Sequence, residues 1–302
     1  MKIAICFSGM VRTGVKAYPS IKRFIGDLWG QCDFFMHTWD KDYHNVLTGE
    51  LSTHFFETNV NLELDKTKLE LLRRLYNLKV VEVDEYWPTM GKIGSIFDNY
   101  IKGEQWIIPW FYSWHRSLYL RKKYEQALKT KYDIVVKLRP DVIFNENIKL
   151  QDLINQIGEN DFGINMVYFD NGVPVTDDIV FVSNSKVADK VSDWWVHRLV
   201  TEEYMDPSIG TFTQFYNFIK LRGVNPIDLQ IPYIGENYKI GLLRQECTLF
   251  DPVTEFDKCV ECDKVHYHTL STDDAKHLTE LDVGNMREHT FKLRKTLPTN
   301  LK

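Results

Sequence analysis

Charged residues that could contact a phosphate follow a run of apolar residues in the segment YDIVVKLRPDVIF. Lys137, Arg139 and Asp141 occupy alternate positions at the end of this run. A guanidinium group can bind a phosphate through two parallel hydrogen bonds, and a carboxylate can ligate Mg²⁺ or Mn²⁺ or bind a ribose hydroxyl. The segment therefore indicates a site for the diphosphate of a nucleotide. The alternative without function is a surface salt bridge or an Asx-turn at Pro140 and Asp141.

A second candidate phosphate contact is the loop SGMVRTG, which follows the first apolar run of the chain. Glycine lets backbone N–H groups approach a phosphate, so Ser8, Gly9 and Arg12 are the residues that we expect to bind a nucleotide here. The loop matches neither GxxxxGK[ST] nor GxGxxG. Turns between strands and helices often contain Gly and Ser without binding anything, so a purely structural turn is the alternative.

Alternating strands and helices must position these residues. Short apolar runs predict strands over residues 2–7, 32–38, 78–83, 132–138, 161–169 and 179–183. Helical spacing of apolar residues predicts helices over residues 18–29, 65–77, 113–131, 185–199 and 208–221, with Ser113 as the cap of the third. Residues 86–109 contain two prolines and three glycines, which predicts a long loop that orders over substrate.

This alternation predicts an α/β fold with a mainly parallel central sheet flanked by helices. Ligands of such sheets bind where the strands end, so the loop SGMVRTG, the segment Thr38-Trp39-Asp40 and the segment Arg139-Pro140-Asp141 should lie on one rim. Asp40 thereby becomes a further candidate for nucleotide binding. We expect one catalytic domain over residues 1–250 and a tail, residues 251–302, that wraps around the same domain.

At these segments the sequence resembles the GT-A-like glycosyltransferases of viral and bacterial type, which are nucleotide-diphospho-sugar transferases. The resemblance covers about residues 1–200 and consists of SGMVRTG, FFMHTWD, the helix from Ser113 and YDIVVKLRPDVIF, in that order. It implies transfer of a hexosyl or pentosyl group from a nucleotide sugar to a glycan or another hydroxyl acceptor. An RxD motif replaces DxD in that family, so the resemblance implies that Asp141 contacts the diphosphate and a Mn²⁺ or Mg²⁺ ion beside Arg139. Because Arg139 stands where DxD enzymes have their first Asp, the need for a metal is conditional.

The resemblance also implies an acidic residue that faces the acceptor, and the segment TDDIVFVS offers two. Asp178 is the first choice and Asp177 the second. In an inverting mechanism this carboxylate would take the proton of the attacking hydroxyl as general base. The alternative is an acidic approach to a strand that has no role in chemistry.

Four residues near the end of the chain have side chains that ligate zinc, namely Cys259, Cys262, His266 and His268. Their spacing fits no standard zinc finger, which leaves three interpretations: a structural zinc site, a strand VHYHTL with alternating exposed histidines, or a contribution to the catalytic metal. The third follows the family resemblance, since some GT-A enzymes bring a late histidine to the metal, here His266 or His268.

Composition restricts the partners. The formal net charge is −5 with both signs interspersed, which argues against a nucleic acid or an anionic membrane as partner. No apolar stretch approaches the length of a membrane-spanning helix, and the five scattered cysteines favour a reducing compartment, so we expect a cytoplasmic protein. A sulfotransferase-like enzyme that uses a phosphoadenosine donor and a non-catalytic nucleotide-binding or assembly protein are the alternatives. The first loop lacks the early basic residue expected of a sulfotransferase.

Overall fold

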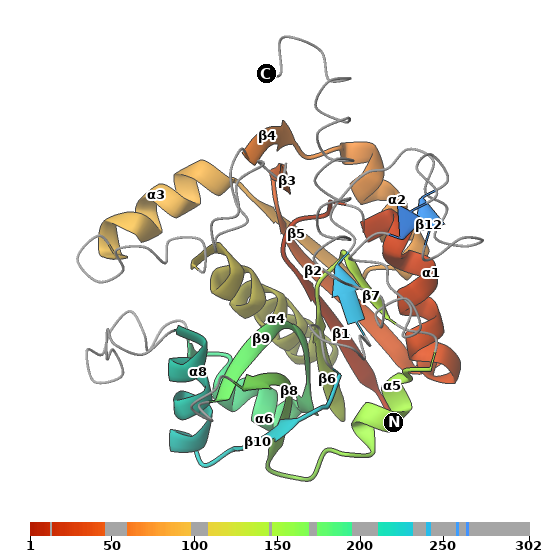
Figure 1. Cartoon of the computed structure of the whole chain (residues 1–302), viewed down its shortest axis with the longest axis vertical. Helices are drawn as coiled ribbons and strands as arrows, with labels where there is room; N and C mark the ends of the chain where they lie inside the picture. The colour runs from red at the N-terminus through yellow and green to blue at the C-terminus, as the bar shows by residue number, and fades with distance from the viewer. Residues whose placement is uncertain are drawn as a thin grey trace.

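The computed structural model of the protein contains a central seven-stranded sheet (Figure 1). The structure describes residues 1–12, 14–45, 59–97, 108–144, 147–168, 174–194, 211–231, 240–242, 258–259 and 264–265. The strand order is β10-β8-β9-β6-β1-β2-β5. In chain order the bounds are β1 Ile3–Ser8, β2 Cys32–Trp39, β5 Val80–Asp84, β6 Ile134–Leu138, β8 Asp161–Tyr168, β9 Pro174–Asn184 and β10 Asn225–Asp228.

Most neighbouring strands of this sheet are parallel. β1 lies between β2 and β6 and pairs with both in parallel, and β2–β5 and β8–β10 are parallel pairs as well. β9 runs antiparallel to both of its neighbours, β6 and β8. Small two-stranded sheets are formed by β3 (Lys41–Asn45) with β4 (Asn59–Glu63), β7 (Val142–Phe144) with β11 (Ile240–Leu242), and β12 (Lys258–Cys259) with β13 (Lys264–Val265).

Helices cover both faces of the sheet, on opposite sides in Figure 1. One face packs against α1 (Gly14–Ile25), α2 (Lys66–Tyr76) and α5 (Leu150–Ile154), and the other against α4 (Ile108–Leu128), α6 (Ser185–Val191) and α8 (Thr211–Leu221). A 3-10 helix, η1 (Gly26–Gln31), joins α1 to β2. The predicted fold class, a mainly parallel sheet flanked by helices, is therefore confirmed.

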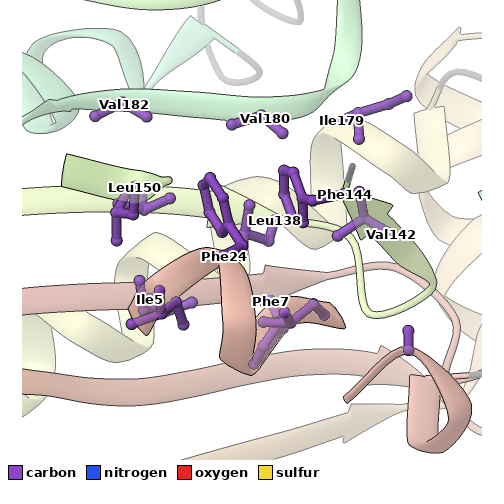
Figure 2. Packing of buried hydrophobic residues seen from close by; sticks show 14 of the residues in the cluster. Ile5, Phe7, Phe24, Leu138, Val142, Phe144, Leu150, Ile179, Val180 and Val182 are labelled. Atoms are coloured by element: carbon purple, nitrogen blue, oxygen red, sulfur yellow. The ribbon is translucent and has the colours of Figure 1, made fainter. Parts of the chain in front are cut away.

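Alternation along the strands divides the core into two layers. Ile3, Ile5 and Phe7 of β1 face the first helical layer, whereas Ala4 and Cys6 face the second. Figure 2 shows the first layer, in which Phe24 of α1 stacks on Phe144 of β7 with ring centroids 3.8 Å apart. The second layer is rich in aromatic rings that contact one another, among them Phe111, Trp114, Phe162, Phe181, Trp194 and Phe215. Much of the aromatic content therefore fills the core.

A buried arginine joins two helices of the second layer. Arg121 of α4 is fully buried, and its Nη1 donates to Glu125 at 2.9 Å and to Ser185 at 2.6 Å. Its Nη2 also donates to Asp189 of α6. Because a buried charge is costly unless it is paired, these contacts make Arg121 the fixed junction between α4 and α6.

The prediction of a loop over residues 86–109 is wrong for its first half. Residues Tyr86–Phe97 form helix α3, and α4 already begins at Ile108; residues 98–107 lie outside the described part of the chain. Pro88 is tolerated because it lies in the first turn, where backbone N–H groups have no partner within the helix. Asp40, which lies between β2 and β3, accepts a hydrogen bond from the N–H of Tyr86 at 2.7 Å and so stabilises that first turn.

The predicted cap role of Ser113 is also wrong. α4 starts five residues earlier, with Pro109 near its first position, where proline is favoured. Ser113 is instead fully buried inside the helix. Similarly, α1 begins at Gly14 and not at Tyr18, and β9 begins at Pro174 and not at Ile179.

Most of the predicted tail, residues 251–302, lies outside the described residues, so the domain division stays a prediction. Among the helices that are described, none is both long and apolar enough to cross a membrane.

Candidate active site at the rim of the sheet

Two of the predicted strand exits meet at the rim. β1 and β6 are parallel neighbours, so both end at the same edge of the sheet. The chain segments that follow them pack closely: a Cβ added at Gly14 would lie 3.2 Å from both Cβ and the carbonyl oxygen of Pro140. A side chain at position 14 would therefore require its neighbours to shift by a few tenths of an ångström, a constraint that the sequence did not reveal.

Four charged residues meet at this point, and we name them the arginine cluster: Arg12, Arg139, Asp141 and Asp178. Arg139 Nε donates to Asp141 Oδ1 at 2.9 Å, and its Nη2 donates to Oδ2 at 3.0 Å. Arg12 Nη1 donates to the same Oδ2 at 3.2 Å. Arg139 Nη1 donates to Asp178 Oδ2 at 3.2 Å. Asp141 is thus bound by two guanidinium groups, and one of these also binds Asp178.

Burial differs sharply within the arginine cluster. The Asp141 side chain is 1% exposed, whereas those of Arg12, Arg139 and Asp178 are 15%, 13% and 24% exposed. The carboxylate of Asp141 is therefore buried, whereas the two arginine side chains that bind it are partly exposed. Asp178 joins the cluster because β9 runs antiparallel, so that the beginning of β9 lies beside the end of β6.

The backbone of the first loop is held in unusual conformations. Gly9 has φ +116°, which only glycine adopts readily, and Arg12 has φ +43°, the left-handed region that is uncommon for residues with a side chain. Such conformations persist where surrounding contacts hold them. The Gly9 N–H donates to Ser113 Oγ at 2.7 Å, and the Arg12 side chain is held by Asp141.

Other predicted residues lie apart from the arginine cluster. Lys137 is buried, with Nζ 5.1 Å from the ring centroids of both Trp110 and Phe181, so it lies in the aromatic layer under α4. Asp40 uses one carboxylate oxygen to bind the N–H at the start of α3. Ser8 is fully buried, and within the described structure its hydroxyl has no hydrogen-bond partner.

Several predicted residues fall partly or wholly outside the described structure. The backbone of Asp177 belongs to β9 and that of Cys259 to β12, but their side chains lie outside it. Cys262, His266 and His268 lie entirely outside the described residues. The zinc site and the metal role of these histidines stay predictions.

A polar group that the sequence analysis did not single out lies between β2, β5 and α4. It consists of His37, Glu82 and Asp84, whose ligand atoms lie within 4.8 Å of one another. Residue types of this kind bind divalent cations. The alternation of acidic residues in the strand VVEVD was the available signal, since Glu82 and Asp84 must face the same side of the sheet.

Hydrogen bonds connect this group to the first loop. Ser113 Oγ accepts from Gly9 N and lies 2.8 Å from His37 Nδ1. His37 Nε2 lies 3.2 Å from Asp84 Oδ2, which also accepts from Tyr112 at 2.7 Å. A neutral His37 with its proton on Nε2 satisfies all of these hydrogen bonds, because Nε2 then donates to Asp84 and Ser113 can donate to Nδ1.

The ionisation of the group follows from its contacts. Burial lowers the pKa of His37 below its ordinary value of 6.5, which favours the neutral ring. The hydrogen bond from His37 lowers the pKa of Asp84 to about 2. Both oxygens of Glu82 accept hydrogen bonds from Arg116, one of them from Nε at 2.8 Å. The candidate metal ligands are therefore already engaged by protein donors.

No protein-family model matches the sequence, and no curated protein shows significant similarity to it. Solved structures similar to this chain include mouse xyloside xylosyltransferase 1 in its apo form, with 10% identity over 74% of this chain and 81% of that chain and a TM-score of 0.37. The galactosyltransferase LgtC in complex with donor and acceptor sugar analogues has 13% identity over 77% and 75%, with a TM-score of 0.40. A nucleoside-diphosphate-sugar pyrophosphorylase from Vibrio cholerae has 9% identity over 81% and 96%, with a TM-score of 0.39. At these identities and scores the similarity assigns no residue role and no substrate to this chain.

Proposed function

We propose that this protein transfers a sugar from a nucleotide-sugar donor to a glycan or another hydroxyl acceptor. The observation that carries the proposal is the arginine cluster. Two partly exposed arginine side chains, bound by one buried carboxylate, lie at the edge of the sheet where β1 and β6 end. Ligands of mainly parallel α/β sheets bind at this edge, and guanidinium groups are suited to phosphates.

The chemistry of sugar transfer needs positive charge where these arginines lie. The bond between the sugar and the diphosphate breaks as the acceptor oxygen attacks, and the departing diphosphate gains negative charge. Donors that are already oriented toward that charge stabilise the transition state most effectively, because they need not reorganise during the reaction. In the proposal, Arg12 and Arg139 contact the diphosphate, and Ser8 and Gly9 line the same end of β1.

Asp178 is the proposed general base. Its carboxylate lies 3.2 Å from Arg139 Nη1 and is partly exposed, so an acceptor hydroxyl could approach it beside the diphosphate. The guanidinium favours the ionised carboxylate, which is the form that takes a proton. Asp177 is the second choice for this role. In the proposal, Asp40 and Lys137 do not take part in the reaction directly. The described contact of Asp40 stabilises the start of α3, and that of Lys137 stabilises the aromatic layer.

Ligand-induced thermal stabilisation tests the donor class. The purified protein is melted with a panel of nucleoside diphosphates and nucleotide sugars, and with 3′,5′-phosphoadenosine, each in the presence of Mn²⁺ and in the presence of EDTA. We expect at least one nucleoside diphosphate or nucleotide sugar to raise the Tm of the wild type but not of Arg139→Gln. Arg74→Gln is the matched control, because Arg74 is 77% exposed on α2 and pairs only with the nearby Glu70 among its described contacts. Stabilisation by the phosphoadenosine alone would refute the proposal.

Turnover tests the role of Asp178. With the stabilising donor, Asp178→Asn should bind the donor at least as tightly as the wild type and lose transfer, because the amide cannot accept the proton from the acceptor. General-base catalysis contributes roughly 10²- to 10⁴-fold, so a loss of that size is expected. Normal transfer by the variant would remove Asp178 from the reaction.

A further inference from the structure

We infer that the rim neutralises the diphosphate with the guanidinium groups of Arg12 and Arg139, and that Asp141 positions these groups and does not ligate a metal ion. The inference rests on the function proposed above and specifies how that site works. It differs from the role implied by the family resemblance, in which Asp141 binds Mn²⁺ or Mg²⁺.

The contacts of Asp141 do not suit a metal ligand. Both carboxylate oxygens accept hydrogen bonds from guanidinium nitrogens, at 2.9, 3.0 and 3.2 Å. The side chain is 1% exposed, so an ion could reach it only past the arginines. Mg²⁺ binds oxygen at about 2.0–2.1 Å and keeps several of its waters. Binding at Asp141 would require these guanidinium groups to move and would then place two positive groups beside a divalent cation.

The position of the two arginines suits a direct phosphate contact. The Arg139 side chain binds Asp141 through two parallel hydrogen bonds, a geometry that fixes the plane of its guanidinium group. Arg12 is held at the same carboxylate from a loop with left-handed backbone, and Gly14 of the following helix packs tightly on Pro140. Two cations are thus preorganised by one buried anion, which is the arrangement that electrostatic catalysis requires.

Charge balance within the arginine cluster connects its members to the reaction. Two guanidinium groups and two carboxylates give a net charge of zero before the reaction. As the acceptor oxygen bonds to the sugar, its proton passes to Asp178, and the electron pair of the broken bond leaves with the diphosphate. Protonation of Asp178 removes the negative charge that Arg139 binds through Nη1. Arg139 then has one fewer anion to balance at the moment when the departing diphosphate gains negative charge. No metal ion is needed to balance this step.

Diphosphate binding with and without metal tests the inference on the wild-type protein. Inorganic pyrophosphate, UDP, GDP and ADP are titrated calorimetrically into protein stripped with EDTA, and again with added Mn²⁺. We expect at least one of them to bind in EDTA, with an affinity that Mn²⁺ changes by no more than about twofold. Loss of hydrogen bonds to a charged group costs roughly tenfold to hundredfold, so Arg12→Gln and Arg139→Gln should each weaken binding by about that factor in EDTA, while Arg74→Gln should not.

Asp141→Asn distinguishes a positioning residue from a metal ligand. A positioning role predicts that the variant keeps or improves its affinity for pyrophosphate, because a negative charge is removed, and that kcat falls because the guanidinium groups lose their orientation. A metal ligand predicts loss of diphosphate binding in Mn²⁺. Circular dichroism separates either result from unfolding. Arg139→Lys, which retains the charge without the two parallel bonds, serves the same purpose as a second variant.

The outcomes separate the inference from the function on which it rests. Binding that needs Mn²⁺ and disappears in Asp141→Asn would overturn the inference and leave sugar transfer standing. Absence of binding by every diphosphate and nucleotide sugar, with and without Mn²⁺, would overturn both.

Discussion

Replacing Ser113 with alanine should destabilise the protein strongly although only one oxygen atom is removed. The hydroxyl of Ser113 is fully buried, accepts from the Gly9 N–H at 2.7 Å and lies 2.8 Å from His37 Nδ1. The variant would leave both of those groups without this partner. Each unsatisfied polar group costs about 1–3 kcal/mol, so the loss of two should lower the free energy of unfolding by about 2–6 kcal/mol.

Ser117 provides the matched control. It lies one turn further along the same helix and is also fully buried, but among the described residues its hydroxyl donates only to the carbonyl of Trp114, within the helix. Ser117→Ala removes one such bond and strands no donor, so it should cost less than about 1 kcal/mol. Urea denaturation of the wild type and both variants gives the midpoints, and a shared slope m converts them to free energies.

One result of this comparison would contradict the prediction for Ser113→Ala. If Ser113→Ala and Ser117→Ala lower the midpoint equally, the bonds from Ser113 to the first loop and to β2 contribute nothing beyond those of an ordinary buried serine. If the slope m also changes, the variants differ in the surface exposed on unfolding, and the midpoints must be compared with each variant's own slope.

The other predictions concern buried charge and packing. Because burial lowers the pKa of His37, the unfolded chain binds more protons than the folded protein below pH 6.5. The free energy of unfolding should therefore fall as the pH drops from 7 to 5. Urea titrations of His37→Gln should show a smaller fall over the same pH range. Arg121→Met removes the charged partner of the buried Glu125 carboxylate and should cost about 3–5 kcal/mol, against less than about 0.5 kcal/mol for exposed Arg74→Met. Equal losses would contradict the assigned junction. In Gly163→Ala the new Cβ would lie 2.6 Å from two side-chain carbons and 3.1 Å from a backbone oxygen. Thermal unfolding should therefore show a loss of stability of about 1–3 kcal/mol. Gly30→Ala is the control and should be nearly neutral, because its Cβ would have no neighbour within 4 Å.

Elements whose signals are local could be predicted closely from the sequence. β1 and β6 consist mainly of apolar residues, and helix α2 has both of its caps in the chain itself. Asp65 accepts from the N–H groups of Thr67 and Lys68, and Asn77 ends the helix with φ +48°. Cap chemistry of this kind depends on neighbouring residues only, so the pattern was sufficient.

Elements stabilised from a distance could not be predicted. The composition of α3, with its proline and glycines, favours a loop, and the acceptor at its first N–H is Asp40, which lies 46 residues earlier. The rim followed from the parallel sheet, but the partners of Asp141 did not, because Arg12 lies 129 residues away in the sequence. The same applies to the bond between His37 and Asp84, which spans 47 residues.

The central place of β1 determines the order in which the chain can fold. β1 precedes β6 by more than a hundred residues and all six of its residues are buried, yet Ile3 pairs with Ile134 of β6. One edge of this apolar strand therefore stays open until β6 has been synthesised. Pairing over such a separation is slow, and an open apolar edge invites association between chains. A fragment that ends before β6 should aggregate, and recovery of the full-length protein should depend on how well chaperones shield its first strand during synthesis.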